Sequence, residues 1–227
     1  MIKKIITYFS PFHWFIIIGM IITNMLVGGC GNILSTICST AGVICVILVA
    51  KGKISNYFFG VINVGLYIFI SWQAKLYGEV MLNALYYFPI QFIGYYLWNK
   101  KIDNTKTVLA RTMTKKQLKA TIVVCIIGVM VYAQLLVYLG GNTPYLDSTS
   151  TVLSIIAQIL MLACFAEQWL LWIVVDIVSV IMWATYAIQT GDASAWSITC
   201  MWLMYLLNAI YGYIFWKNQS RLGDNNV

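Results

Sequence analysis

The chain has 227 residues, of which 61% are hydrophobic and 9% are charged, and its mean hydropathy is +0.83. A water-soluble domain of this length could not solvate such a surface, so the composition excludes a soluble protein and predicts a polytopic membrane protein. The formal net charge of +7 raises the question of an acidic partner, and the placement of the basic residues answers it below.

Eight apolar stretches are long enough to cross a bilayer as helices. Short breaks that contain glycine, such as Lys51-Gly52-Lys53 and Thr190-Gly191-Asp192, separate most of them. The expected spans are Phe12–Gly29, Asn32–Ala50, Asn56–Lys75, Glu79–Trp98, Lys119–Gly140, Thr149–Phe165, Gln168–Gln189 and Ala193–Trp216.

The basic residues predict the orientation of the chain. Eight spans place both termini on one side, together with the long basic connection from Asn99 to Gln117. If that side is the cytoplasm, Lys75 is the only Lys or Arg left outside, as the positive-inside rule requires. We therefore expect a multi-pass protein of the inner (plasma) membrane with both termini in the cytoplasm. Its basic residues would lie near anionic lipid and not bind nucleic acid.

An internal repeat relates spans two to four to spans six to eight. Both copies start outside, so we expect parallel repeats related by an axis along the membrane normal. With a shift of 116 residues, Asn56, Gly60, Asn63, Tyr67 and Gln73 align with Trp172, Asp176, Ser179, Trp183 and Gln189. With two further residues, Gly94-Tyr-Tyr-Leu-Trp98 aligns with Gly212-Tyr-Ile-Phe-Trp216.

The repeat predicts an all-α protein with a 3+1+3 core and one additional N-terminal helix. The expected parts are the additional helix (1–30), a first triple-helix bundle (31–98), a basic cytoplasmic linker with a connector helix (99–148), a second bundle (149–217) and a cytoplasmic tail (218–227).

The stretch from Glu167 to Tyr186 carries the most unusual residue of the chain. Asp176 falls near the middle of this apolar helix, where an acid costs several kcal/mol unless it faces protein or a watery cavity. The spacing of three and four residues places Trp169, Trp172, Asp176, Ser179, Trp183 and Tyr186 on one face of the helix. We expect this face to point inward.

Other polar residues fall at the same depth, where parallel-repeat transporters bind their substrates between the bundles. We expect Pro89 to loosen the helix beside Gln91. Amides, aromatic faces and one acid suit a flat, hydrogen-bonding, cationic ligand. The candidate substrate-binding residues are Asn63, Tyr67, Tyr87, Gln91, Gln158, Asp176, Ser179, Trp183 and Asn208, and Tyr205 lies at the same depth.

A structural role is the alternative for each of these residues. Buried amides join membrane helices, with a gain of about 0.6–2 kcal/mol each. Trp98 and Trp216, near the ends of their spans, fit an interfacial aromatic belt. Other classes of protein fit less well. An enzyme needs a nucleophile–base pair or a metal cluster, and a channel needs a carboxylate ring or a filter signature. We expect no enzyme, no metal site and no cofactor.

Several segments resemble the PnuC family of vitamin transporters. They are Lys53-Ile-Ser-Asn-Tyr-Phe-Phe-Gly-Val-Ile-Asn63, Asp147-Ser148, Val152-Leu-Ser-Ile-Ile-Ala157, Gln168-Trp-Leu-Leu-Trp-Ile173 and Ser179-Val180, and the likeness runs from about residue 32 to 216. The resemblance implies a design related to the SWEET sugar transporters and a homotrimer with one path per protomer.

The resemblance also implies a function. Nicotinamide riboside would cross the membrane by facilitated diffusion and be trapped by a cytoplasmic nucleoside kinase. Thiamine and riboflavin, the substrates of sister branches, remain alternatives, as does a membrane enzyme that transports nothing. Whether Asp176 couples transport to protons also stays open.

Overall fold

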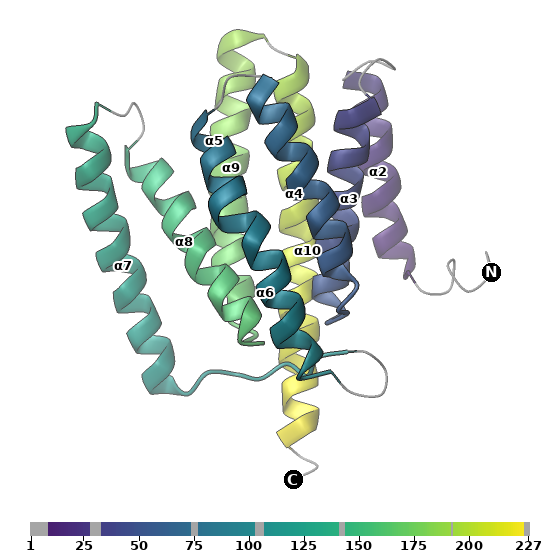
Figure 1. The fold of residues 1–227 in the computed structure, drawn as a ribbon, viewed down its shortest axis with the longest axis vertical. Helices are drawn as coiled ribbons and strands as arrows, with labels where there is room; N and C mark the ends of the chain where they lie inside the picture. The colour runs from purple at the N-terminus through teal and green to yellow at the C-terminus, as the bar shows by residue number, and fades with distance from the viewer. Residues whose placement is uncertain are drawn as a thin grey trace.

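The computed structural model describes residues 9–27, 33–73, 77–102, 107–140, 144–191 and 193–224, which form a bundle of helices (Figure 1). The helices are α2 (Pro11–Val27), α3 (Ile33–Ala50), α4 (Asn56–Gln73), α5 (Tyr77–Leu82), the π-helix η1 (Asn83–Tyr87), α6 (Phe88–Asn99), α7 (Lys115–Tyr138), α8 (Pro144–Leu162), α9 (Gln168–Thr190) and α10 (Ala193–Asp224).

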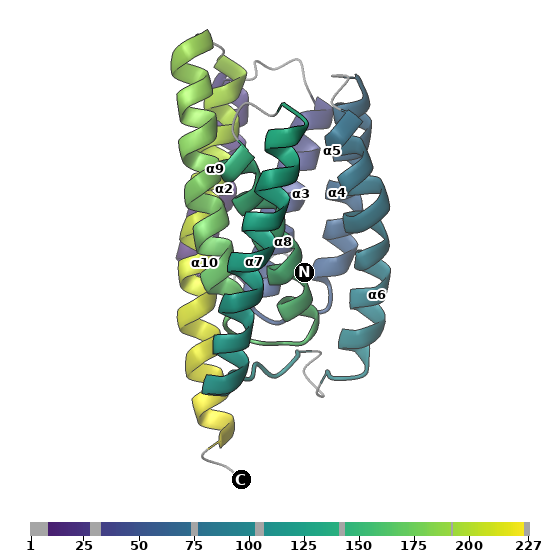
Figure 2. The same ribbon diagram turned by 90° about the vertical axis from the view of Figure 1, so that its left-hand side faces the viewer.

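The helices follow the expected spans closely and confirm an all-helical membrane protein. Within the described residues, four helices are long and apolar enough to cross a bilayer, namely α7, α8, α9 and the Ile198–Ser220 part of α10. Shorter apolar helices are Pro11–Thr23, Thr36–Ala50 and Asn56–Ile70. The expected fourth span is divided into α5, η1 and α6. Helix α10 continues past the expected end at Trp216 and projects beyond its neighbours (Figure 2).

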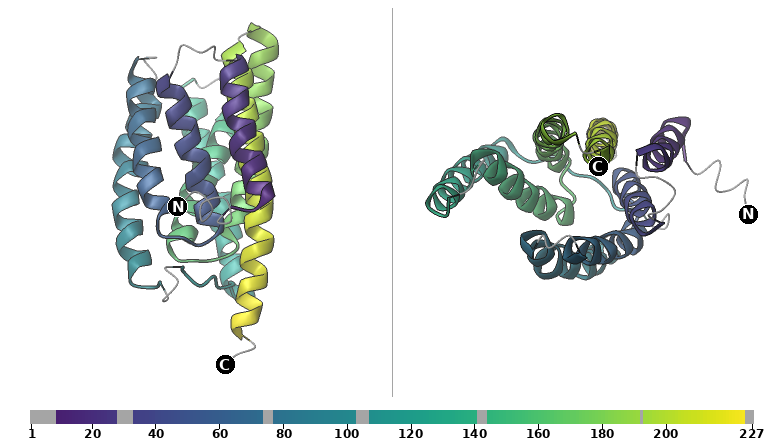
Figure 3. Two further views of the ribbon diagram at one scale, coloured as in Figure 1. Left: turned by 90° about the vertical axis from the view of Figure 1, so that its right-hand side faces the viewer. Right: turned by 90° about the horizontal axis from the view of Figure 1, so that it is seen from above.

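The helices pack in two groups. In one group α4 contacts α3, α5, η1 and α6, and in the other α9 contacts α8 and α10. The groups meet where α10 packs on α3 and where α6 approaches α8. Viewed from above, the blue helices and the green and yellow helices form two separate arms (Figure 3). Helix α7 packs on α8 at one edge, and α2 packs on α3 and α10.

The loop between α3 and α4 and the loop between α8 and α9 have the same backbone conformation. Gly52 and Cys164 both adopt a left-handed φ, of 63° and 62°. The hydrogen bond from Lys53 N to Leu48 O recurs 112 residues later from Phe165 N to Leu160 O. The two loops are therefore offset by 112 residues. The expected shift of 116 was wrong here by about one helical turn, because apolar helices look alike when displaced by a turn.

The offset of 118 residues at the ends of the two groups agrees with the sequence repeat. Trp98 at the end of α6 donates an indole hydrogen bond of 3.1 Å to Met161 O of α8. Trp216 on α10 makes the corresponding bond of 2.9 Å to Ala50 O of α3. Both indoles are fully buried, so the expected interfacial belt was wrong for these residues. Each indole donates to a carbonyl near the end of a helix, where carbonyls lack an intrahelical donor. Met161 O also accepts a hydrogen bond of 2.9 Å from Cys164 N in the following turn.

The helix is irregular at Pro89, as expected. The π-helix η1 ends at Tyr87, and Pro89 lies in the first turn of α6, where its missing N–H needs no partner. A π-turn inside a membrane helix shifts the faces of the residues that follow it, and such turns are frequent at functional sites. Gln91 lies one turn beyond this irregularity.

Two glycines allow aromatic rings to approach the helix backbone at equivalent places. A Cβ added to Gly94 would lie 2.6 Å from Tyr57 Cζ, and one added to Gly212 would lie 2.6 Å from Trp169 Cε2. Tyr57 and Trp169 are themselves related by the 112-residue offset. Close approach of rings to backbone at these points depends on the absence of a side chain.

We predict that Gly94→Ala and Gly212→Ala each lower the free energy of unfolding by about 1–3 kcal/mol, because overpacking forces the rings aside. Thermal unfolding in detergent measures the change. Gly65→Ala is the matched control, since its Cβ would meet nothing closer than Phe88 Cε2 at 3.9 Å. Equal melting temperatures for all three variants would contradict the packing argument.

Candidate functional site

Gly42 on α3 brings together two polar side chains from different helices. A Cβ at Gly42 would lie 2.5 Å from the Tyr205 hydroxyl of α10 and 2.7 Å from Asn63 Nδ2 of α4. Asn63 donates a hydrogen bond of 2.9 Å to Cys38 O, which anchors its amide on α3. One face of α3 therefore holds an amide from the first group of helices beside a phenol from the second.

Asp176 on α9 belongs to the same neighbourhood. Its side chain is 3% exposed, as predicted for an inward-facing acid, and Ser179 one turn later is 4% exposed. The Tyr205 hydroxyl lies within electrostatic range of both Asp176 and Tyr67. Among the buried polar side chains of the described residues, Asp176 is the only one of an acidic or basic residue other than His13. A carboxyl group thus faces an interior in which the structure describes no Lys or Arg.

Gln91 on α6 lies against α4 and α3. Its Oε1 occupies the position that a Cβ on Gly60 would need, and Cys45 Sγ would lie 3.4 Å from the same Cβ. Its Nε2 donates to Tyr87 O at 3.3 Å, back across the junction of η1 and α6. Cys45 also lies within electrostatic range of Tyr205, so the Gln91 region adjoins the Gly42 region.

Asn208 ties the two groups of helices together beside this centre. Its Nδ2 donates 3.0 Å to Val46 O of α3, while its Oδ1 is buried without a protein partner among the described residues. The Nδ2 atom therefore has the structural role that was the alternative for each candidate, because it joins two helices. The Oδ1 atom remains available as a hydrogen-bond acceptor.

The remaining candidates are less central. Gln158 is buried on α8. The Tyr87 ring packs edge-on against Tyr86, and Trp183 packs edge-on against Tyr186, which is 47% exposed. The polar centre thus consists of Asn63, Tyr67, Asp176 and Tyr205, with Gln91 and Asn208 next to them. The ring contacts of Tyr87 and Trp183 are with Tyr86 and Tyr186, which do not belong to this centre.

Sequence reasoning missed several residues of the centre. Cys38 and Cys45 were not among the candidates, yet Cys38 O accepts the hydrogen bond of Asn63 and Cys45 lies beside Gln91. It also missed buried polar atoms at the start of α4 and α9 that have no protein partner among the described residues. They are Asn56 Oδ1, the Tyr57 hydroxyl, both polar atoms of Gln168 and Trp169 Nε1. The correct 112-residue offset would have paired these residues.

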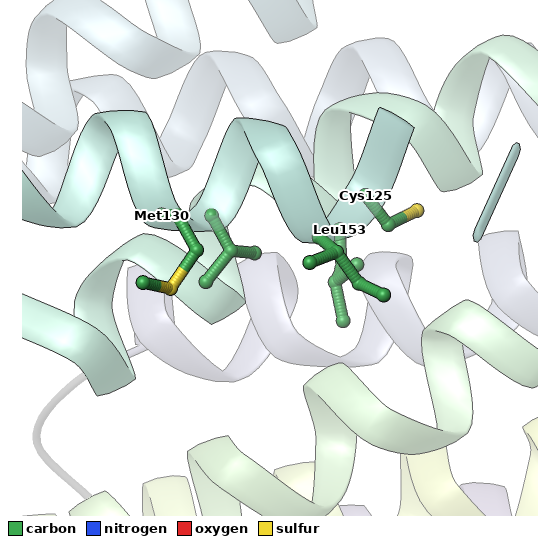
Figure 4. Close-up of a pocket in the computed structure, with 5 residues that line it drawn as sticks. Cys125, Met130 and Leu153 are labelled. Atoms are coloured by element: carbon green, nitrogen blue, oxygen red, sulfur yellow. The ribbon is translucent and has the colours of Figure 1, made fainter. Parts of the chain in front are cut away.

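Two cavities lie away from this centre. One, of about 250 Å³, is lined by the apolar side chains of Cys125, Ile126, Val129, Met130 and Leu153 between α7 and α8 (Figure 4). A polar ligand would find no hydrogen-bond partner among these side chains. The second, of about 360 Å³, lies beside the start of α7 and is lined by Thr112, Leu118, Ala166, Glu167, Leu170, Tyr213 and Lys217. The described residues contain no cluster of three potential metal ligands.

The two helix groups and the polar centre between them define a helical membrane transporter. Residues 32–218 match the nicotinamide mononucleotide transporter family. The chain belongs to this family, which includes the PnuC transporters. The resemblance to PnuC seen in the sequence is thereby confirmed.

Individual relatives agree with this assignment. The chain is 42% identical over 188 residues to the nicotinamide riboside transporter PnuC of Neisseria mucosa, covering 81% of this chain and 71% of that protein. It is 39% identical to the Haemophilus influenzae transporter of the same name, covering 81% and 78%. A crystal structure of the vitamin B3 transporter PnuC superposes with a TM-score of 0.78 at 37% identity, covering 94% and 93%. These relatives are transporters, in line with the expectation that the chain is not an enzyme.

We predict that Asp176→Asn leaves the protein folded and as stable as the original chain, or more so. A buried carboxyl that faces no cation destabilises the fold, and a neutral amide of the same shape removes that penalty. Thermal unfolding in detergent at neutral pH measures the difference. A clear loss of stability would show that Asp176 has a structural role instead.

Proposed function

We propose that this chain carries nicotinamide riboside across the membrane by facilitated diffusion. Two of the relatives named above are nicotinamide riboside transporters, and this chain covers more than two thirds of the length of each. The observation that carries the proposal to this chain's own residues is Asp176, a buried carboxyl near Asn63 and Tyr205. Nicotinamide riboside combines a pyridinium cation with a carboxamide and ribose hydroxyls, and each part needs a different partner.

The charge of the centre favours the riboside over the mononucleotide named by the family. A mononucleotide adds a phosphate with about two negative charges. Asp176 would repel it, and the buried part of the described chain offers no Lys or Arg to bind it. Leaving a phosphate buried without a cation costs far more than leaving a hydroxyl there. The pyridinium, by contrast, gains from an opposite charge in a medium of low dielectric constant.

The amides would bind the polar edges of the substrate. Gln91 of α6 lies over Gly60 of α4, and Asn63 of α4 lies beside Gly42 of α3. Asn208 Oδ1, buried without a protein partner among the described residues, is an acceptor for a ribose hydroxyl or the carboxamide. Tyr205, which lies near Asp176, and Tyr67, which lies near Tyr205, would hold the cationic ring through their faces.

The transport cycle follows from the repeated architecture. We propose a 3+1+3 arrangement in which α3 to α6 and α8 to α10 form the two bundles, α7 connects them and α2 is additional. Rocking of one bundle against the other would expose the centre to either side in turn. The basic linker would face the cytoplasm, in accordance with the positive-inside rule. Assembly as a homotrimer in the inner membrane and trapping by a cytoplasmic nucleoside kinase complete the proposal.

We predict that the purified protein binds nicotinamide riboside in calorimetry and binds nicotinamide mononucleotide at least tenfold more weakly. Asp176→Asn should weaken riboside binding by about 1.5–3 kcal/mol, roughly 10- to 150-fold, because a hydrogen bond or ion pair to a charged group is lost. Asp147→Asn, an acid in the first turn of α8, is the control and should bind normally.

Other ligands in the same experiment test the alternatives. Thiamine is also an aromatic cation. If it binds more tightly than the riboside, the chain is a thiamine transporter of a sister branch that uses the same centre. Tighter binding of riboflavin would contradict the role of Asp176, since riboflavin is neutral. Failure to bind any of them would contradict the proposed function itself.

We also predict that Gln91→Ala weakens riboside binding by about 1–3 kcal/mol, because a buried polar group of the substrate then lacks its partner. The melting temperature should stay close to that of the original chain, since the side-chain hydrogen bond described for Gln91 goes to Tyr87 O, one turn earlier in the chain. Gln134→Ala on α7, an exposed glutamine, is the matched control. Equal affinities of the Gln91 and Gln134 variants would refute this role.

A further inference from the structure

The start of α7 stands apart from α9 and α10. Helix α7 packs on α8, and among the described residues it makes no comparable contact with α9 or α10. Figure 1 shows the lower end of α7 separated from the lower part of α10. The second cavity, of about 360 Å³, is lined by residues that precede or belong to all three helices. It therefore lies outside the polar centre, at the end of the molecule where α7 and α9 begin.

Backbone hydrogen bonds hold the segment that forms one wall of this cavity. Residues 107–113, which precede α7, lie against both repeated loops. Arg111 N donates 3.0 Å to Cys164 O, and Ala166 N donates 2.9 Å back to Arg111 O. Thr112, the next residue, lines the cavity together with Ala166. The cavity thus has a wall that is fixed by main-chain contacts.

Two opposite charges line the cavity without pairing with each other. Glu167, just before α9, accepts a hydrogen bond of 3.0 Å from Met113 N, and its Oε2 is buried without a protein partner among the described residues. Lys217 of α10 donates 3.1 Å to the Tyr213 hydroxyl, and within the described chain it forms no ion pair with an acid. A carboxylate and an ammonium thus face one space, and each lacks a partner of opposite charge.

The Lys217 side of the cavity can bind a phosphate. An ammonium carries three N–H donors, of which one goes to Tyr213, and the Tyr213 hydroxyl that accepts this bond can donate its own proton. The Glu167 side offers the opposite chemistry, because a carboxylate only accepts hydrogen bonds. A ligand that pairs both sides therefore carries a phosphate and a cation with N–H donors.

The position of the cavity favours a lipid headgroup as this ligand. Lys217 directly follows Trp216, the expected end of the last span. Lys115, Lys116 and Lys119 at the start of α7 are exposed at the same end, which is typical of the headgroup level of a bilayer.

The rest of the lining is apolar and open to the outside of the bundle. Leu118 of α7, Ala166 and Leu170 of α9 line the cavity, and Leu170 is 38% exposed. Such a wall suits the glycerol part and the first carbons of an acyl chain, which remain in contact with the surrounding lipid.

We propose that this cavity binds the headgroup of phosphatidylethanolamine, in the leaflet on the side of the basic residues. The ethanolamine ammonium donates to the Glu167 carboxylate, and the phosphate accepts from Lys217 and Tyr213. The bound headgroup thereby connects the start of α7 with α9 and α10, which α7 itself does not contact. The site does not depend on the substrate that the chain transports.

Other common headgroups satisfy fewer of these groups. Phosphatidylglycerol brings a phosphate but no cation, so Glu167 would stay unpaired and repel it. Phosphatidylcholine brings both charges, but its quaternary ammonium has no N–H to donate. Phosphatidylcholine and phosphatidylethanolamine differ by three methyl groups on the nitrogen, so their comparison isolates the hydrogen bond to Glu167.

Native mass spectrometry of the purified chain tests the proposal with these three lipids, all carrying the same acyl chains and added without riboside. We expect one phosphatidylethanolamine per chain, bound at least about fivefold more tightly than either other lipid, because a hydrogen bond to a charged group is gained. Equal affinities for the ethanolamine and choline lipids would overturn the proposal. Tighter binding of phosphatidylglycerol would do the same, since it would show attraction by the lysines alone.

Substitutions in the cavity test the role of each charge. Glu167→Gln should reduce the preference for the ethanolamine over the choline lipid to less than about twofold, while its amide oxygen still accepts from Met113 N. Lys217→Gln should weaken both lipids alike and keep the preference, since both bring a phosphate. Asp147→Asn and Lys119→Gln, which lie outside the cavity, are the matched controls.

Two readouts of the Glu167→Gln variant do not depend on how much of it folds. The ratio of the two affinities is measured on the same bound population, and the affinity for phosphatidylglycerol should rise at least about twofold because a repulsive charge is removed. A preference for the ethanolamine lipid that survives this substitution, or an unchanged affinity for phosphatidylglycerol, would overturn the proposed role of Glu167.

Discussion

The hydrogen bonds from Trp98 to Met161 O and from Trp216 to Ala50 O are the interactions on which the rest of the structure depends. A membrane protein must satisfy its backbone carbonyls internally, and the last carbonyls of a helix have no intrahelical donor. Here Trp98 at the end of α6 donates to α8, and Trp216 on α10 donates to α3. The two bonds join the two groups of helices near the ends of α3 and α8.

The glycines and the aromatic cluster follow from that exchange. For Trp98 and Trp216 to reach across, Tyr57 and Trp169 must lie flat against α6 and α10, which Gly94 and Gly212 permit. The Trp98 and Trp216 rings then lie 6.1 Å apart, and Trp169 packs edge-on against Trp216. A second apolar cluster, formed by Ile16, Ile17, Met20, Val43 and Ile47, packs against Tyr205 further along α3.

Helix α3 connects the aromatic end of the molecule with the polar centre. Its last residue, Ala50, accepts the Trp216 bond, Val46 accepts the bond of Asn208, and Gly42 lies against the Tyr205 hydroxyl and the Asn63 amide. All three contacts join α3 to α10, so a displacement of α10 at the aromatic end also changes the spacing of the side chains around Gly42. The pair of α3 and α10 thus links the aromatic end of the molecule to the polar side chains around Gly42. A buried carboxyl such as that of Asp176 costs stability, and the proposed role in binding a cationic substrate would account for its presence.

The sequence alone determined the membrane class, the positions of the spans, the basic end and the inward face of Asp176. These properties are local: hydropathy, helical period and charge are read from neighbouring residues, and burial of a mid-span acid follows from its solvation energy. The tertiary structure decided the register of the repeat, the burial of Trp98 and Trp216, the meeting of Asn63 and Tyr205 at Gly42, and the contacts of residues 107–113 with the two repeated loops. Each of these depends on which turn of one helix meets which turn of another. A helix displaced by one turn shows nearly the same sequence pattern, so only packing between distant segments distinguishes the alternatives.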